Sequence, residues 1–186
     1  MPPAYWDPLP TARALAAADA RFPVFQGRWA DRNWRNVPGP FYGADTDCMM
    51  MGRLEAPHHI AYDGEREFVF RQPVTAEESG AFVHGAGLEL YTAYACDGDE
   101  HWTVESVRDW WADRGRVREW AVAIGAEWAA YDPESPYSGH YREAAQGHRD
   151  FVAYIDDGGL EAYLRGYLFW LEHLFEPGPG QALPVL

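Results

Sequence analysis

The chain has no lysine, only two cysteines and no long hydrophobic run. All 15 of its cationic side chains are arginines, against 29 aspartates and glutamates, and the formal net charge is -14. Affinity for nucleic acids comes chiefly from basic side chains that release counterions, so this balance argues against a general nucleic-acid binder. It is typical of a soluble protein, or of a protein whose partner is basic.

Segments that would direct the chain to or across a membrane are also lacking. The longest clean apolar stretch, near Gly166–Leu171, is far shorter than the roughly 20 residues that a membrane helix needs. The first eight residues have neither the basic start nor the apolar core of a secretory signal. We therefore expect a cytoplasmic protein with reduced thiols and no membrane association.

The familiar enzyme signatures are absent as well. The sequence contains no P-loop, dinucleotide fingerprint, nucleophile elbow or His-Glu-x-x-His motif. Gly39 cannot open a phosphate cradle, because Pro38 and Pro40 flank it and remove backbone donors. We predict no cofactor, and the question of enzymatic activity stays open.

What is present suffices for one folded domain with a substantial core. The chain has 186 residues, of which 47% are hydrophobic, and no boundary divides its charge. We predict a single globular domain over 1–186, with 1–10 and 177–186 as candidate extended tails. Its class is α+β, mainly helical, with a small antiparallel β-hairpin or sheet.

Helical periodicity dominates the second half of the chain. Apolar side chains recur at spacings of three and four from Val104 to Tyr131, with a break or kink expected at Gly115. Gly158 and Gly159 end a second helical stripe. This second stripe predicts a helix over 141–155. Further helices are predicted over 11–20, from the capping-box-like start at Thr75, and over 160–174.

Two short strands, 58–62 and 66–71, flank a turn at 63–65 and predict a hairpin. Alternation along these strands indicates which side chains point inward, namely Ile60, Tyr62, Phe68 and Phe70.

The segment 22–57 is dense in Pro, Gly, Trp and Asn, which favours a long ordered loop. Its Asp45 and Asp47 are candidate catalytic residues, or ligands for a hard cation, and His58 and His59 could add nitrogen ligands. The alternative is structural: the aspartates cap local backbone, and the two histidines start a strand on opposite faces.

Cysteine and histidine offer a weaker metal hypothesis. Cys48, Cys96 and His101, with His58 or His59, could form a zinc site, although nothing in their spacing requires it. The run 97–108 superficially resembles a calcium loop, but its sixth and twelfth positions hold tryptophan and arginine. A turn that leads into a helix capped at Thr103 explains the same residues.

Two further sets of residues are candidates for binding. Arginine and tryptophan together can hold an anion, which makes Arg28, Arg32, Arg35, Trp34 and Tyr42 candidate ligand-binding residues. Salt bridges and tryptophan packing are the alternative. Trp110 and Trp120 lie off the apolar stripe beside acidic residues, so they are candidate anchors of a protein interface.

Three segments of the chain, 35–47 (RNVPGPFYGADTD), 67–73 (EFVFRQP) and 96–99 (CDGD), resemble a family of uncharacterised bacterial proteins, mainly from actinobacteria. The resemblance covers most of the chain and implies no established activity or catalytic residue. Such sequences are sometimes labelled ferredoxin, but two cysteines cannot supply the four thiolates of an ordinary cluster.

Acidity without an enzyme signature favours a protein-binding module, in the manner of an immunity or antitoxin-like inhibitor of a basic partner protein. The alternatives are a metal-assisted enzyme with a site in the 36–59 loop, or a small-anion-binding protein. No pattern indicates an oligomeric state.

Overall fold

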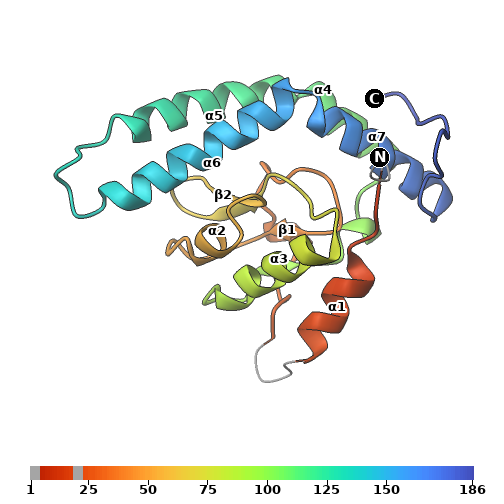
Figure 1. Cartoon of the computed structure of the whole chain (residues 1–186), viewed down its shortest axis with the longest axis horizontal. Helices are drawn as coiled ribbons and strands as arrows, with labels where there is room; N and C mark the ends of the chain where they lie inside the picture. Colours follow the sequence, from red (N-terminus) through yellow and green to blue (C-terminus); the bar gives the residue numbers. More distant parts are fainter. Residues whose placement is uncertain (1–4, 19–22) are drawn as a thin grey trace.

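The computed structural model describes residues 5–18 and 23–186. Two helical layers enclose the short strands (Figure 1). The lower layer contains α1, α2 and α3, and the upper layer contains α4, α5, α6 and α7. The predicted mainly helical α+β domain is confirmed.

The lower layer comes from the first half of the chain. Its helices are α1 (Leu9–Ala18), α2 (Met51–Glu55) and α3 (Ala76–Leu88). The predicted cap of α3 is confirmed, because Thr75 Oγ1 accepts a hydrogen bond from the Glu78 N–H at 3.1 Å. α1 begins two residues before its predicted start, and its predicted end at Ala20 lies outside the described residues.

The upper layer comes from the second half. It contains α4 (Val104–Ala112), α5 (Arg114–Ala129), α6 (Ser138–Asp156) and α7 (Gly159–His173). Thr103 and Ser106 form a capping box at the start of α4. The expected break falls at Asp113 rather than at Gly115, whereas Gly158, with φ 80°, separates α6 from α7 as predicted. None of the helices in residues 5–18 and 23–186 is long and apolar enough to cross a membrane.

The predicted hairpin is confirmed as β2 (Ile60–Tyr62) antiparallel to β3 (Glu67–Val69). A second antiparallel pair, which the sequence did not predict, joins β1 (Tyr42–Gly43) to β4 (Tyr94–Ala95). One-turn 3-10 helices lie at Trp29–Asp31 and Gly98–Glu100.

The hairpin is buried on both faces, which corrects its predicted orientation. Ile60 stands opposite Val69, and Ala61 stands opposite Phe68, so Ile60 and Phe68 point to opposite faces. Ile60 packs with Phe82 of α3 in a cluster that we call the lower core. Phe68 packs with Phe151 of α6 in a second cluster, which we call the upper core. The prediction that all four side chains point to one core was wrong because the strands lie between two helical layers, so both of their faces are buried.

The two ends of the described chain pack against the upper layer. Tyr5 is 1% exposed, and its ring lies 5.7 Å from that of Tyr167 on α7. Near the C-terminus, Arg108 donates to the Val185 carbonyl oxygen and Arg165 donates to that of Pro184. These contacts hold Tyr5 and the segment 184–185 against the helices.

Two buried amides fix the segment that precedes β1. Asn36 Oδ1 accepts hydrogen bonds from the N–H groups of Gly43 and Val69, at 2.9 and 2.8 Å. Gln72 accepts from the Phe41 N–H and donates to the carbonyl oxygens of Val37 and Phe41. Buried loop backbone needs such partners because water cannot reach it.

A close backbone approach explains why β1 ends in a glycine. A Cβ atom at Gly43 would lie 2.6 Å from the Glu67 carbonyl oxygen. Residues of the RNVPGPFYGADTD motif thus have a packing role in the fold.

Replacing Asn36 tests this role. Asn36→Ala leaves the buried N–H groups of Gly43 and Val69 without their acceptor, so we expect the free energy of unfolding to fall by about 3 kcal/mol in urea denaturation. Gln26→Ala is the control, because the Gln26 side chain is exposed and its amide donates to the neighbouring Phe25 carbonyl oxygen. It should change stability by less than about 0.5 kcal/mol. Equal effects of both substitutions would contradict the role assigned to Asn36.

Candidate ligand-binding site

The two candidate catalytic aspartates do not face each other. The Asp45 side chain is 80% exposed and lies 3.5 Å from Arg66. Asp47 is buried, and its two oxygens accept hydrogen bonds from the N–H groups of Met49 and Leu90, at 2.7 and 2.8 Å. Asp47 therefore caps local backbone, as the structural alternative proposed.

The neighbouring histidines also point apart. His58 is exposed, whereas His59 is 2% exposed, and its Nδ1 lies 3.0 Å from the Arg71 carbonyl oxygen. Burial lowers the pKa of His59, which favours the neutral form of its imidazole. This arrangement separates the two rings instead of directing both at one metal ion.

The weak zinc candidates are not brought together either. Cys48 is exposed, while Cys96 is half-buried against the lower core, and burial raises the pKa of its thiol. His101 stacks on Trp29 with ring centroids 4.7 Å apart. In the described part of the chain, no group of three or more His, Cys, Asp or Glu side chains is placed to hold a metal ion.

Each candidate anion-binding arginine has its own intramolecular partner. Arg28 pairs with Asp31, and the Arg32 guanidinium lies 4.1 Å from the centroid of the Trp29 ring. Arg35 pairs with Asp63 at 2.8 Å, and the buried Tyr42 donates to Asp97. Burial, followed by Asp97, raises the pKa of Tyr42. These contacts match the salt-bridge alternative.

The candidate interface tryptophans are half-buried against the upper core. Arg116 and Arg35 lie over the Trp34 ring, at 4.1 and 4.6 Å, and Arg35 also lies 4.1 Å from the Trp120 centroid. Trp120 is therefore one layer of an arginine–tryptophan stack. Trp110 packs on the same core.

Sequence reasoning missed two buried carboxyl groups that lie close to Asp47. Glu67 Oε1 accepts from the Arg53 N–H at 2.7 Å, and Oε2 accepts from the Tyr94 hydroxyl at 2.9 Å. Glu89 Oε1 accepts from the Asp47 N–H at 2.8 Å. No local motif marks these glutamates, because their burial depends on contacts distant in sequence.

The site of Glu67 favours its protonated form. Burial raises the pKa of Glu67 to about 7; hydrogen bonds from Arg53 and Tyr94 oppose the rise, and Asp47 and Glu89 add to it. Glu67 and Asp47 hold the backbone of Arg53 and Met49, which lie on either side of Met50. Met50 itself has the left-handed φ of 61°. The buried carboxyl groups thus fix the conformation of segment 48–50.

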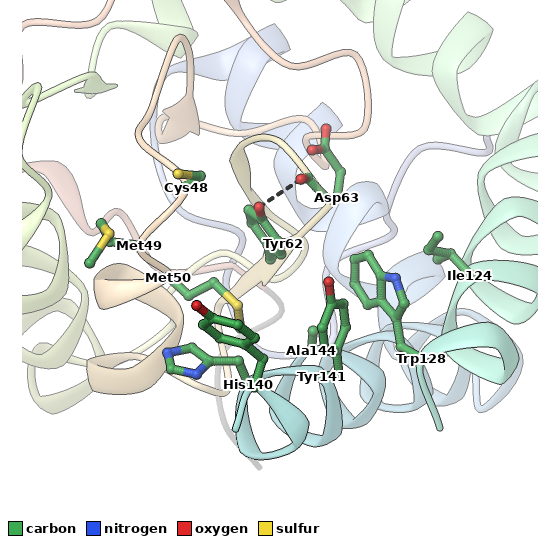
Figure 2. Close-up of a pocket in the computed structure, with 12 residues that line it drawn as sticks. Cys48, Met49, Met50, Tyr62, Asp63, Ile124, Trp128, His140, Tyr141 and Ala144 are labelled. Atoms are coloured by element: carbon green, nitrogen blue, oxygen red, sulfur yellow. Dashed lines mark hydrogen bonds between the residues drawn. The ribbon is translucent and has the colours of Figure 1, made fainter. Parts of the chain in front are cut away.

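This segment forms one wall of a cavity of about 460 Å³, which we call the aromatic pocket (Figure 2). The β2–β3 turn forms a second wall, and α5 with the start of α6 forms the third. Its lining consists of Cys48, Met49, Met50, Tyr62, Asp63, Gly64, Ile124, Trp128, Tyr137, His140, Tyr141 and Ala144.

Three aromatic rings connect the second and third walls of the aromatic pocket. Tyr62 and Trp128 stack with centroids 5.9 Å apart, and Trp128 meets Tyr141 edge to face at 6.0 Å. The Tyr62 hydroxyl donates to the Gly64 carbonyl oxygen at 2.7 Å, the bond drawn as a dashed line in Figure 2. Asp63 turns its carboxylate toward Arg35 and Asn33.

The lining of the aromatic pocket comes from three distant stretches, 48–50, 62–64 and 124–144. Of these residues, the sequence marked Cys48 as a metal candidate and Tyr62 as an inward-pointing side chain of the hairpin, and it predicted no pocket at either. Comparisons with models of known protein families, with curated proteins and with solved structures found no match to this chain.

Glu67 leads to a prediction about pH. A carboxyl whose pKa is raised from 4.5 to about 7 on folding binds more protons in the folded state, so its contribution to stability is lost as pH rises between these values. Glu67→Gln removes this loss. We expect the variant to gain on the order of 3 kcal/mol relative to the natural chain between pH 4.5 and pH 7.5 in urea denaturation.

Comparing the variant with the natural chain at each pH separates the effect of Glu67 from that of groups whose contribution to stability changes with pH in the opposite direction. Burial lowers the pKa of His148 to about 4, so His148 destabilises the fold as pH falls below 6.5. Glu65→Gln, on the exposed turn two residues away, is the matched control and should show no such gain. A difference between Glu67→Gln and the natural chain that does not change with pH would refute the assignment.

Proposed function

We propose that this protein binds a small molecule with an apolar or aromatic body in the aromatic pocket. The observation that carries the proposal is the cavity of about 460 Å³ lined by the contacting rings of Tyr62, Trp128 and Tyr141. Sites for small ligands are typically concave, mostly apolar and about 300 to 1,000 Å³ in volume.

The rigidity of the pocket wall supports this proposal. His148 is 1% exposed, and its Nε2 donates to the Tyr62 carbonyl oxygen at 2.9 Å. The His148 ring also packs on Trp128, with centroids 5.1 Å apart. A wall whose side chains are already ordered loses less conformational entropy when a ligand binds.

Filling the aromatic pocket tests the proposal. We expect a ligand-observed NMR screen of small aromatic and aliphatic molecules to find ligands of the natural chain. At 100 times its Kd, such a ligand should raise the free energy of unfolding by about 2.7 kcal/mol. Ile124→Trp places a large ring in the cavity from α5, so we expect it to abolish binding.

Val122→Trp is the matched control, because Val122 lies on the same helix, is 47% exposed and does not line the aromatic pocket. It should bind the ligands normally. Circular dichroism checks that both variants are folded. If no molecule binds, or if Ile124→Trp and Val122→Trp bind equally well, the pocket is not the binding site.

The charge distribution favours a second candidate function, the binding of a basic protein partner. Several arginines are engaged within the fold: Arg35 with Asp63, Arg53 near Asp150, and Arg118 with Asp156 at 2.5 Å. The carboxylates are in large excess, at 29 to 15. An acidic surface steers a basic partner toward it and gives salt-sensitive association.

This candidate predicts a heterocomplex with a basic protein when native extract of the producing cells passes over the immobilised chain. The Kd of the purified pair, measured by calorimetry, should rise at least tenfold between low and high salt. Retention of salt-indifferent proteins alone would count against it.

A further inference from the structure

The aromatic pocket presents electron-rich groups to its interior. Its lining combines the rings of Tyr62, Trp128 and Tyr141 with the sulfur atoms of Met49 and Met50. The faces of aromatic rings carry partial negative charge and attract cations within about 6 Å. The described lining contains no arginine, and its one basic side chain is His140.

The surroundings of Tyr62 show the same sign of charge. Burial is the main cause that raises the pKa of Tyr62 to about 12, and the carboxylates of Asp63 and Glu65 are among the neighbours that raise it further. Arg35 pairs with Asp63 and lies over the rings of Trp34 and Trp120. Arg35 is engaged by these contacts and does not line the pocket, so no arginine of the described lining is placed to hold an anion.

The polar groups of the pocket select among cations. A primary ammonium group is strongly hydrated and needs several acceptors when it leaves water. The Gly64 carbonyl oxygen already accepts from the Tyr62 hydroxyl, and the Asp63 carboxylate already accepts from Arg35 and Asn33, which leaves the hydroxyls of Tyr137 and Tyr141 and the His140 ring as the main polar groups of the described lining. An alkylated ammonium group has fewer N–H donors to satisfy and spreads its charge over apolar surface, which suits a wall of rings and thioethers.

We propose that the ligand of the aromatic pocket is an organic cation, with an alkylated ammonium group against the rings of Tyr62, Trp128 and Tyr141. This inference rests on the proposed function and adds the sign of the charge and the chemical class of the ligand.

A matched pair of probes tests the charge alone. Choline carries a trimethylammonium group, and 3,3-dimethylbutan-1-ol has the same shape with a neutral carbon in place of the nitrogen. We expect choline to bind the natural chain with a Kd at least threefold lower than that of the neutral alcohol, by ligand-observed NMR titration. Ile124→Trp should lose choline binding, which places the probe in the aromatic pocket rather than on the acidic surface.

Substitutions at Tyr141 test the role of its ring. Tyr141→Phe keeps an aromatic face and should keep the preference for choline, whereas Tyr141→Leu keeps an apolar side chain and should reduce the preference to less than half. Thermal unfolding checks that both variants are folded. Equal loss of preference in both variants would exclude the ring as the cause and overturn its part in the proposal.

The outcomes separate the two proposals. If the neutral alcohol binds as well as choline or better, and Ile124→Trp blocks it, the charge proposal fails and the pocket remains a binding site. If neither probe binds and the wider screen of neutral molecules also finds no ligand, the proposed function fails and the charge proposal with it. If choline binds Ile124→Trp unchanged, the cation is held by the general acidity of the surface, and the charge proposal is overturned.

Discussion

The hairpin of β2 and β3 lies between two helical layers, so both of its faces are buried and every polar group around it needs an internal partner. Asn36 completes the hydrogen bonds of the loop that leads to β1. From the upper layer, His148 caps the Tyr62 carbonyl oxygen, and from α2 Arg53 donates to the Ile60 carbonyl oxygen at 3.2 Å. The orientation of the layers relative to the strands depends on these few side chains.

The same constraint builds the aromatic pocket. Glu67 leaves water at the cost of a raised pKa, and with Asp47 it fixes the backbone on either side of Met50. Met50 accordingly holds a left-handed conformation that is rare outside glycine. Buried carboxyl groups thus act on the pocket from behind its wall, without lining it, and they connect the stability of the fold to the shape of a binding site.

Patterns that act over short sequence distances predicted much of the fold. The caps at Thr75 and Thr103 and the break at Gly158 are local chemistry, and each falls where it was predicted. β1, β4 and α2 escaped prediction because elements of two to five residues are stabilised by partners distant in sequence. The sequence marked Asp47 as a candidate catalytic residue or cation ligand, with backbone capping as the alternative, and in the structure it accepts from the N–H groups of Met49 and Leu90.

The sequence by itself determined the acidity of this protein, its helical second half and several helix ends, because composition, periodicity and capping need no knowledge of the tertiary contacts. Only the tertiary structure decided that the hairpin is buried on both faces and that Tyr62, Trp128 and Tyr141 meet around a cavity. Periodicity shows which side of a helix is apolar, but it does not show which apolar sides close against each other and which leave space between them.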